Sequence, residues 1–262
     1  MEKFHPTAYF SRGIVKKDPH YHDCHQMILV VKGEVCFSLG RQHYTARAGN
    51  AVIFSRYENH SVRVLSREYE RYVLELDPQE GGIEKSMEAL LSNRPEGFCR
   101  VLDVSEEQGR LEDVFCRLAE EESTSRRFSQ EMRRLLVHEL LILLCRRMPE
   151  LPPFNETVYR IQKQMEENCR ASFTLEGLAA QYSLSPSNLS HRFKRITGVS
   201  VMEYLISCRM ALAKRLLSET DLEIGRIVEA CGFSDSSNFS RSFRQRNGLS
   251  PSDFRKQYTK KR

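Results

Sequence analysis

The chain lacks the segments that would place it in a membrane or direct it out of the cell. No apolar run in its 262 residues approaches the ~20 residues needed to cross a bilayer. Its N-terminal residues also lack the apolar core of a signal peptide. We therefore expect a cytoplasmic protein without a membrane partner.

Closely spaced cysteines are also missing. The eight cysteines are scattered, and no two have the spacing of a metal-ligand pair or a Cys-x-x-Cys motif. In a reducing compartment such residues serve as small buried apolar side chains or as surface thiols. This distribution argues against a disulfide or zinc framework, and we expect no cofactor.

Excess positive charge is absent from the first part of the chain and concentrated in the second. Residues 156–262 hold 18 Lys and Arg against 11 Asp and Glu, whereas residues 1–155 hold 22 against 24. This asymmetry is typical of a polyanion-binding module joined to a neutral module. The length allows two domains with separate cores.

Short apolar runs with glycine turns between them dominate residues 1–77. A series of short strands of this kind favours a small barrel or sandwich. The predicted strands are residues 27–31, 35–39, 51–54 and 72–76.

Residues 106–148 change to a helical period, with apolar stripes beginning at Leu111 and at Leu135. The two predicted helices either pack on the strands or form a seam with a second subunit. The period alone leaves both arrangements open. Prolines in 149–155 predict a linker, so the expected domains are 1–148 and 156–262.

A polar repeat is the most informative pattern of the second domain. Residues 185–198 return 50 residues later, so that Leu189 aligns with Phe239 and Phe193 with Phe243. Each copy is the second helix of a helix-turn-helix pattern, whose second helix can enter the major groove of DNA. Double-stranded DNA is therefore the expected partner.

The outward side chains of the two copies are the candidates for contact with DNA. Side chains early in each helix are placed for base edges, and later basic residues are placed for phosphates. The expected base contacts are Ser187, Asn188, Ser190, His191, Ser236, Ser237, Ser240 and Arg241, and the expected phosphate contacts are Lys194, Arg195, Arg244 and Arg246.

An amphipathic helix at about 200–217 connects the two copies. Its length of ~26 Å at 1.5 Å per residue compares with ~34 Å for one turn of DNA. A rigid rod of this length can set both reading helices into successive major grooves, so that one monomer reads two adjacent segments.

The second copy and the residues after it resemble the signature of the AraC/XylS transcription regulators. The resemblance covers about 156–258 and includes the stretch 227–244 and the closing Ser-Pro-Ser-Asp-Phe-Arg at 250–255. It implies regulation by a small molecule, often a sugar or related carbon source, and activation through RNA polymerase, with repression as the alternative. It also implies base contacts from Ser187, His191, Ser237 and Arg241.

Histidines in the first domain form a second candidate site. His20 and His22 lie at i and i+2, so they point to one face of a strand, and a third imidazole can come from a facing strand. The arrangement resembles the cupin barrel, with Gln26 in place of its acidic ligand and Gly49 and His60 as its second motif. We expect a ligand pocket without metal, although three imidazoles can bind a transition metal. The expected lining residues are His20, His22, Gln26 and His60, with Arg47 and Tyr72 as further candidates, and the histidines His20, His22 and His60 are the ligands if a metal is held.

The expected fold class is α+β, with an N-terminal cupin-like barrel plus two helices and a C-terminal all-α domain with two helix-turn-helix units joined by a linker helix. The expected function is that of a ligand-controlled, homodimeric DNA-binding transcription regulator and not of an enzyme. Two alternatives remain: a metal-dependent cupin enzyme fused to a DNA-binding module, and a DNA-binding dimer that needs no ligand.

Overall fold

The structure of the protein is a computed structural model. The chain divides into two compact units, one within Met1–Asn93 and Gly97–Phe154 and the other within Asn155–Arg262. Most of the predicted linker, 149–153, lies outside the described residues. The described residues are 6–13, 16–39, 42–76, 90–92, 98, 100–124, 126–148 and 154–258.

Two antiparallel sheets form the first unit, in the orders β1-β8-β3-β6-β9 and β2-β7-β4-β5. All four predicted strands are confirmed, as β3, β4, β6 and β8. The strands are β1 (Thr7–Arg12), β2 (Lys16–His20), β3 (His25–Lys32), β4 (Glu34–Leu39), β5 (Gln42–Arg47), β6 (Asn50–Phe54), β7 (His60–Val64), β8 (Glu70–Leu76) and β9 (Val101–Asp103).

Strand β3 shows how the layers stack. Met27 and Leu29 pack in one apolar cluster with the helices of the unit, whereas Ile28 and Val30 pack in another with Phe37 of β4. Because both faces of β3 are buried, its sequence is a continuous apolar run and not an alternating one. The unit therefore has three layers, with the five-stranded sheet in the middle.

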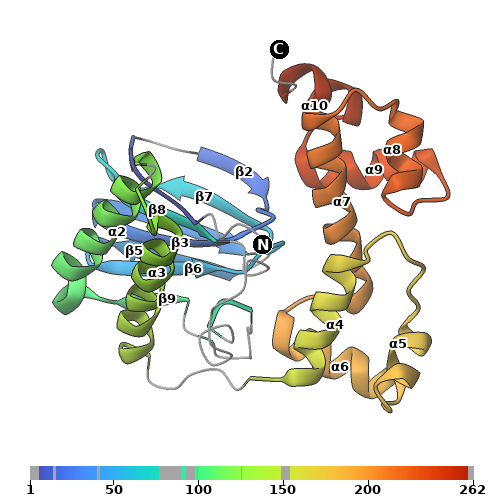
Figure 1. Ribbon diagram of the computed structural model, residues 1–262, viewed down its shortest axis with the longest axis horizontal. Coiled ribbons are helices and arrows are strands. Elements are labelled where there is room, and N and C mark those ends of the chain that lie inside the picture. Colours follow the sequence, from blue (N-terminus) through green and yellow to red (C-terminus); the bar gives the residue numbers. More distant parts are fainter. Residues whose placement is uncertain are drawn as a thin grey trace. The chain divides into compact units, whose positions relative to one another are not determined.

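Helices α2 (Gln108–Ser123) and α3 (Ser129–Arg146), preceded by a short turn η2 (Ser105–Glu107), confirm the helical period of the sequence. They lie together against the five-stranded sheet (Figure 1). Leu111 begins the buried stripe of α2, as predicted, but Leu135 is 62% exposed and does not belong to the core. The other leucines of the predicted stripe of α3 are buried, namely Leu136, Leu140, Leu143 and Leu144.

The described part of the second unit is entirely helical. Helix α7 (Val201–Glu219) has α5 and α6, the first helix-turn-helix, at one end (Figure 1). Helices α8 and α9, the second helix-turn-helix, lie at its other end (Figure 1). Among the described residues, no single helix is both long and apolar enough to cross a bilayer, and α6 with α7 meets that test only as a pair bent by 57°. The helices are α4 (Glu156–Glu167), α5 (Leu175–Gln181), α6 (Pro186–Thr197), α7 (Val201–Glu219), α8 (Ile224–Ala230), α9 (Ser236–Asn247) and α10 (Pro251–Tyr258).

Candidate nucleic-acid interface and ligand pocket

The first helix-turn-helix consists of α5, a turn and α6. The hydroxyl of Thr174 accepts a hydrogen bond from the Gly177 N–H, and that of Ser185 accepts one from the Asn188 N–H, so each helix begins at a capping side chain. Helix α6 ends at Gly198, whose φ of 80° is left-handed. Local sequence signals therefore fix both helices.

Helix α6 buries few side chains and exposes many. Leu189, Phe193 and Ile196 are buried in the unit. The opposite face is polar and basic, and its members come from both predicted sets. Ser187, Asn188, His191, Lys194 and Arg195 are exposed, and Ser190 is half-buried.

The second helix-turn-helix repeats this construction with α8 and α9. Asp235 caps α9 by accepting from the N–H groups of Ser237 and Asn238 at 3.1 and 2.8 Å. Phe239 and Phe243 are fully buried. Gly248 ends the helix with a φ of 73°. Of the predicted residues, Ser236, Ser237, Arg241 and Arg244 are exposed, while Ser240 and Arg246 are half-buried.

Contacts near the middle of the unit hold the second copy against residues 169–171, which follow α4. Arg209 of α7 donates from Nε to the Cys169 carbonyl at 2.8 Å and from Nη2 to the Ala171 carbonyl at 2.9 Å. Its guanidinium also lies 5.5 Å from the centre of the Phe233 ring. A Cβ at Gly232 would lie 2.6 Å from the Arg170 carbonyl oxygen, so this turn requires glycine.

Three buried cysteines lie around Arg209, and their burial makes them unreactive. Cys169, Cys208 and Cys231 are buried. Burial raises the pKa of Cys231 to about 12 and also raises that of Cys169, so both stay protonated. They act as small apolar side chains.

One basic residue of α6 was not among the predicted contacts. Arg192 is half-buried, and it lines a surface hollow together with Asn188, His191 and Arg195. The sequence does not mark Arg192 as a contact residue, because the helical period places it between the buried face and the outward face of α6.

In the first unit, strands β2 and β7 bring the predicted histidines together. His20 pairs with His60 in the ladder between these strands. The ligating atoms of His20, His22 and His60 all lie within 4.8 Å of one another. These histidines and Gln26 line one cavity, so the four predicted lining residues meet.

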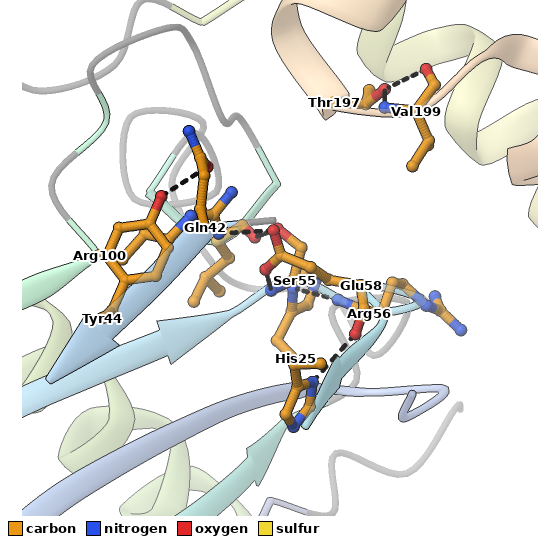
Figure 2. A network of polar contacts seen from close by, with 11 residues as sticks. His25, Gln42, Tyr44, Ser55, Arg56, Glu58, Arg100, Thr197 and Val199 are labelled. Carbon is orange, nitrogen blue, oxygen red and sulfur yellow. Dashed lines mark hydrogen bonds and ion pairs between the residues drawn. The ribbon is translucent and has the colours of Figure 1, made fainter. Parts of the chain in front are cut away.

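His60 follows in the chain a polar network of Ser55, Glu58 and Arg100, which Figure 2 labels. Its Nδ1 lies 3.0 Å from the Glu58 carbonyl and must donate to it, which makes Nε2 the acceptor nitrogen of the neutral ring. The Glu58 carboxylate accepts from the Ser55 N–H at 3.1 Å and pairs with Arg100 at 2.5 Å. The half-buried ion pair of Glu58 and Arg100 thus fixes the loop that precedes His60.

Gln26 faces the cavity from β3, with its amide held in place. Its Nε2 donates to the Glu75 carboxylate at 3.2 Å, and the Tyr9 hydroxyl donates to the same oxygen at 3.4 Å. Burial, and then the charge of Glu75, raises the pKa of Tyr9 to about 12. The carboxylate nearest to Gln26 is therefore already occupied by two donors of the chain.

The cavity has two further polar residues that the sequence analysis did not find. Tyr69 is 2% exposed, and its hydroxyl has no hydrogen-bond partner among the described residues. Arg71 lies with its guanidinium 4.8 Å from the Tyr69 ring centre, and its buried Nη1 likewise has no such partner within the described ranges. Both line the cavity with the histidines.

The two other candidates from the sequence do not reach the cavity. Arg47 is exposed at the end of β5. Tyr72 points to the opposite face of its sheet, where its ring stacks on Phe115 of α2 at 5.3 Å. Because side chains alternate along a strand, Arg71 and not Tyr72 faces the space between the sheets.

The three histidines are a chemically suitable donor set for a transition-metal ion. His60 even has the backbone hydrogen bond at Nδ1 that orients metal-binding imidazoles. The charge of the cavity opposes a cation, however. With neutral histidines, Arg71 carries the only full charge among the described lining residues. Gln26 supplies no negative charge to offset a divalent ion.

Comparison with known protein families divides the chain in the same two parts. Residues 11–141 match the family model of an AraC-like ligand binding domain. Residues 178–257 match that of a helix-turn-helix domain. The first match covers the sheets with the histidine cavity, and the second covers α6, α7 and α9.

Individual relatives extend over much of the chain. The HTH-type transcriptional activator RhaS of Klebsiella pneumoniae (strain 342) is 26% identical over a match that covers 97% of each protein. The arabinose operon regulatory protein of Escherichia coli (strain K12) is 32% identical over 56% of this chain and 52% of its own length. These relatives are named as regulators and not as enzymes.

A solved structure shares the fold over nearly the whole chain. ToxT from Vibrio cholerae O395 has a TM-score of 0.63 and 14% sequence identity, over 99% of each chain. At this identity the similarity concerns the fold. The α+β organisation, with a β-rich first domain and a helical second domain, is thereby confirmed.

Proposed function

The chain belongs to the AraC family of transcription regulators, and on this premise we propose that it reads two adjacent DNA segments with α6 and α9 under the control of a small molecule. The observation that carries the proposal is the pair of exposed polar and basic helices packed at the two ends of one rod. Their few buried anchors leave a whole face of each helix for DNA.

The length of the rod fits this function. Helix α7 has 19 residues, so it spans about 28 Å at 1.5 Å per residue, close to the ~34 Å of one DNA turn. The capping box of Ser200 and Glu203 fixes its start. Hydrogen bonds from the Ser200 side chain and backbone lower the pKa of Glu203, so this cap stays ionised at neutral pH.

Substitution of Arg241 is the most direct test of the proposal that the exposed face of α9 contacts bases. The exposed guanidinium of Arg241 on α9 can pair bidentately with guanine, so Arg241→Ala should weaken specific binding by about 1–3 kcal/mol. The measurement is fluorescence anisotropy at fixed salt, with a DNA site selected by this protein from a random pool and the same fragment after shuffling. Specific binding should fall while binding to the shuffled fragment changes little.

Arg160→Ala is the matched control, because Arg160 is an exposed arginine of the same unit on α4, ion-paired with Glu156. It should leave both affinities unchanged. Lys194→Ala should instead weaken binding to both fragments and reduce the salt slope by about 1, as expected for a phosphate contact. Equal losses for Arg160→Ala and Arg241→Ala would contradict the assignment of α9.

The cavity between the two sheets is the proposed effector site, lined by His20, His22, Gln26 and His60 without a metal. A sugar or related carbon source is supported by the name of the arabinose operon relative. Activation is supported by the name of the RhaS relative, a transcriptional activator. Contact with RNA polymerase and a cytoplasmic location belong to the same proposal. Effector binding would shift the population between two arrangements of the DNA-binding units.

A homodimer is the proposed assembly, through the outer face of α3. Met132, Leu135 and Ile142 are 40%, 62% and 38% exposed and recur at helical spacing, so two copies of the face can cover each other about a two-fold axis. Leu135→Glu should convert dimers to monomers in sedimentation velocity. Leu65→Glu, at a 46% exposed site away from α3, is the control. A wild-type chain that stays monomeric at high concentration would exclude this assembly.

A further inference from the structure

The lining of the cavity includes two polar groups that no described residue satisfies. The Tyr69 hydroxyl and the Arg71 Nη1 are buried and make no hydrogen bond to any residue that the structure describes. Leaving such donors buried without a partner costs free energy, and native proteins seldom do so without a functional reason. A bound molecule that accepts from both would remove this cost.

The charge of the donors defines the acceptor. Arg71 is permanently cationic, and its planar guanidinium matches the two oxygens of a carboxylate. Burial raises the pKa of Tyr69 to about 12, so its hydroxyl keeps its proton and donates at physiological pH. Glu75, the carboxylate that Gln26 contacts, already accepts from Gln26 and Tyr9.

We propose that the effector carries a carboxylate, which binds between Arg71 and Tyr69 while the histidines and Gln26 contact the rest of the molecule. This rests on the proposed function of the cavity as the effector site. It changes the expected effector from a neutral sugar to an acidic molecule, such as a sugar acid or another short organic acid.

The free space of the cavity has room for a carboxylate group but not for a whole sugar acid. This free space of about 30 Å³ is about that of two water molecules. Tyr69 is 2% exposed, whereas Tyr9 is 40% exposed and marks the open side. The carboxylate would occupy the closed end, and the remainder of the effector would extend past Tyr9 and the half-buried His20 and His22.

Small carboxylates test the proposal on the full chain. Acetate and lactate should raise the Tm by about 3–6 °C at ten times their Kd, whereas acetamide, lactamide and chloride at equal ionic strength should not. Arg71→Gln should weaken acetate binding at least about tenfold, because a charge-assisted hydrogen bond is lost. Tyr69→Phe, which removes only the hydroxyl, should weaken it about threefold.

Arg63→Gln is the matched control, since Arg63 is an exposed arginine on β7 outside the cavity lining. Absence of any carboxylate effect beyond that of chloride up to about 100 mM, or equal effects on wild type and both variants, would overturn the proposal. If the neutral arabinose shifts Tm and DNA affinity while carboxylates do neither, the sensor function stands and the carboxylate site fails. If acetate binds through Arg71 but no ligand alters DNA affinity, the site stands and its sensing role fails.

Discussion

In the first helix-turn-helix the turn is left-handed at Ser183, with a φ of 54°, whereas in the second it is left-handed at Gly232, with a φ of 74°. Ser183 is exposed and its side chain has room. Gly232 lies against the Arg170 backbone, where even a methyl group would collide. The left-handed residue of the turn thus has room for a side chain in one copy and none in the other, where it lies against the segment that follows α4.

This difference shows how two similar modules can have different roles in one unit. The second copy is joined through Gly232 and Arg209 to the segment that follows α4, so its orientation depends on contacts far apart in sequence. The first copy is held to α4 itself by side chains, because the Tyr182 hydroxyl donates to Gln164 Oε1 at 3.1 Å and Gln164 Nε2 donates to Gln181 Oε1 at 3.0 Å. Its left-handed residue Ser183, however, is exposed and makes no close approach of this kind. We therefore expect substitutions in the two turns to have unequal effects.

The largest expected effect is that of Gly232→Ala, which disrupts the contact with the Arg170 backbone. A Cβ 2.6 Å from the Arg170 carbonyl oxygen, added to the strain of a positive φ, should lower the free energy of unfolding by about 3 kcal/mol. The measurement is guanidinium unfolding of the full chain followed by helical circular dichroism.

Two alanine substitutions serve as controls for this comparison. Ser183→Ala, at the equivalent turn, should change the free energy of unfolding by less than about 0.5 kcal/mol. Gly225→Ala lies in helix α8, where an added Cβ meets nothing within 4 Å. It should raise the free energy of unfolding by up to about 1 kcal/mol. A Gly232→Ala variant as stable as Ser183→Ala would show that the second copy is not held by this contact.

A smaller effect is expected from the N-caps of the two reading helices. Asp235 accepts from two N–H groups, so Asp235→Ala should lower the free energy of unfolding by about 1–2 kcal/mol. Ser185→Ala removes one hydrogen bond, so it should lower this free energy by only about 0.5–1 kcal/mol. The same unfolding experiment measures both. Asp235→Ser, which keeps a capping oxygen, should recover most of the loss, and equal costs at the two caps would refute the expected ranking.

Helices were predictable from the sequence where their signals are local. Thr174, Ser185 and Gly198 mark helix ends by their own chemistry, and each caps a helix in the structure. Strands with polar alternating sequences, such as β5 and β7, were missed because they lack an apolar run. For them the partner strand, and not the segment itself, decides the conformation.

The cavity could be predicted only in part. His20, His22 and Gln26 are close together in sequence, and His60 was recognised through its resemblance to a known motif. Tyr69 and Arg71 were not found, because their role depends on which face of β8 turns toward the second sheet. Tyr72, the neighbour chosen instead, packs on α2.

The sequence by itself determined the two reading helices, since caps, glycine ends and apolar spacing act within a few residues and repeat in the second copy. Only the tertiary structure decided what the sheets enclose, because Tyr9, His20, Gln26, His60 and Arg71 come from five different strands. It also decided that Gly232 is fixed by the Arg170 backbone. Contacts between distant segments depend on packing, and packing leaves no local pattern in the chain.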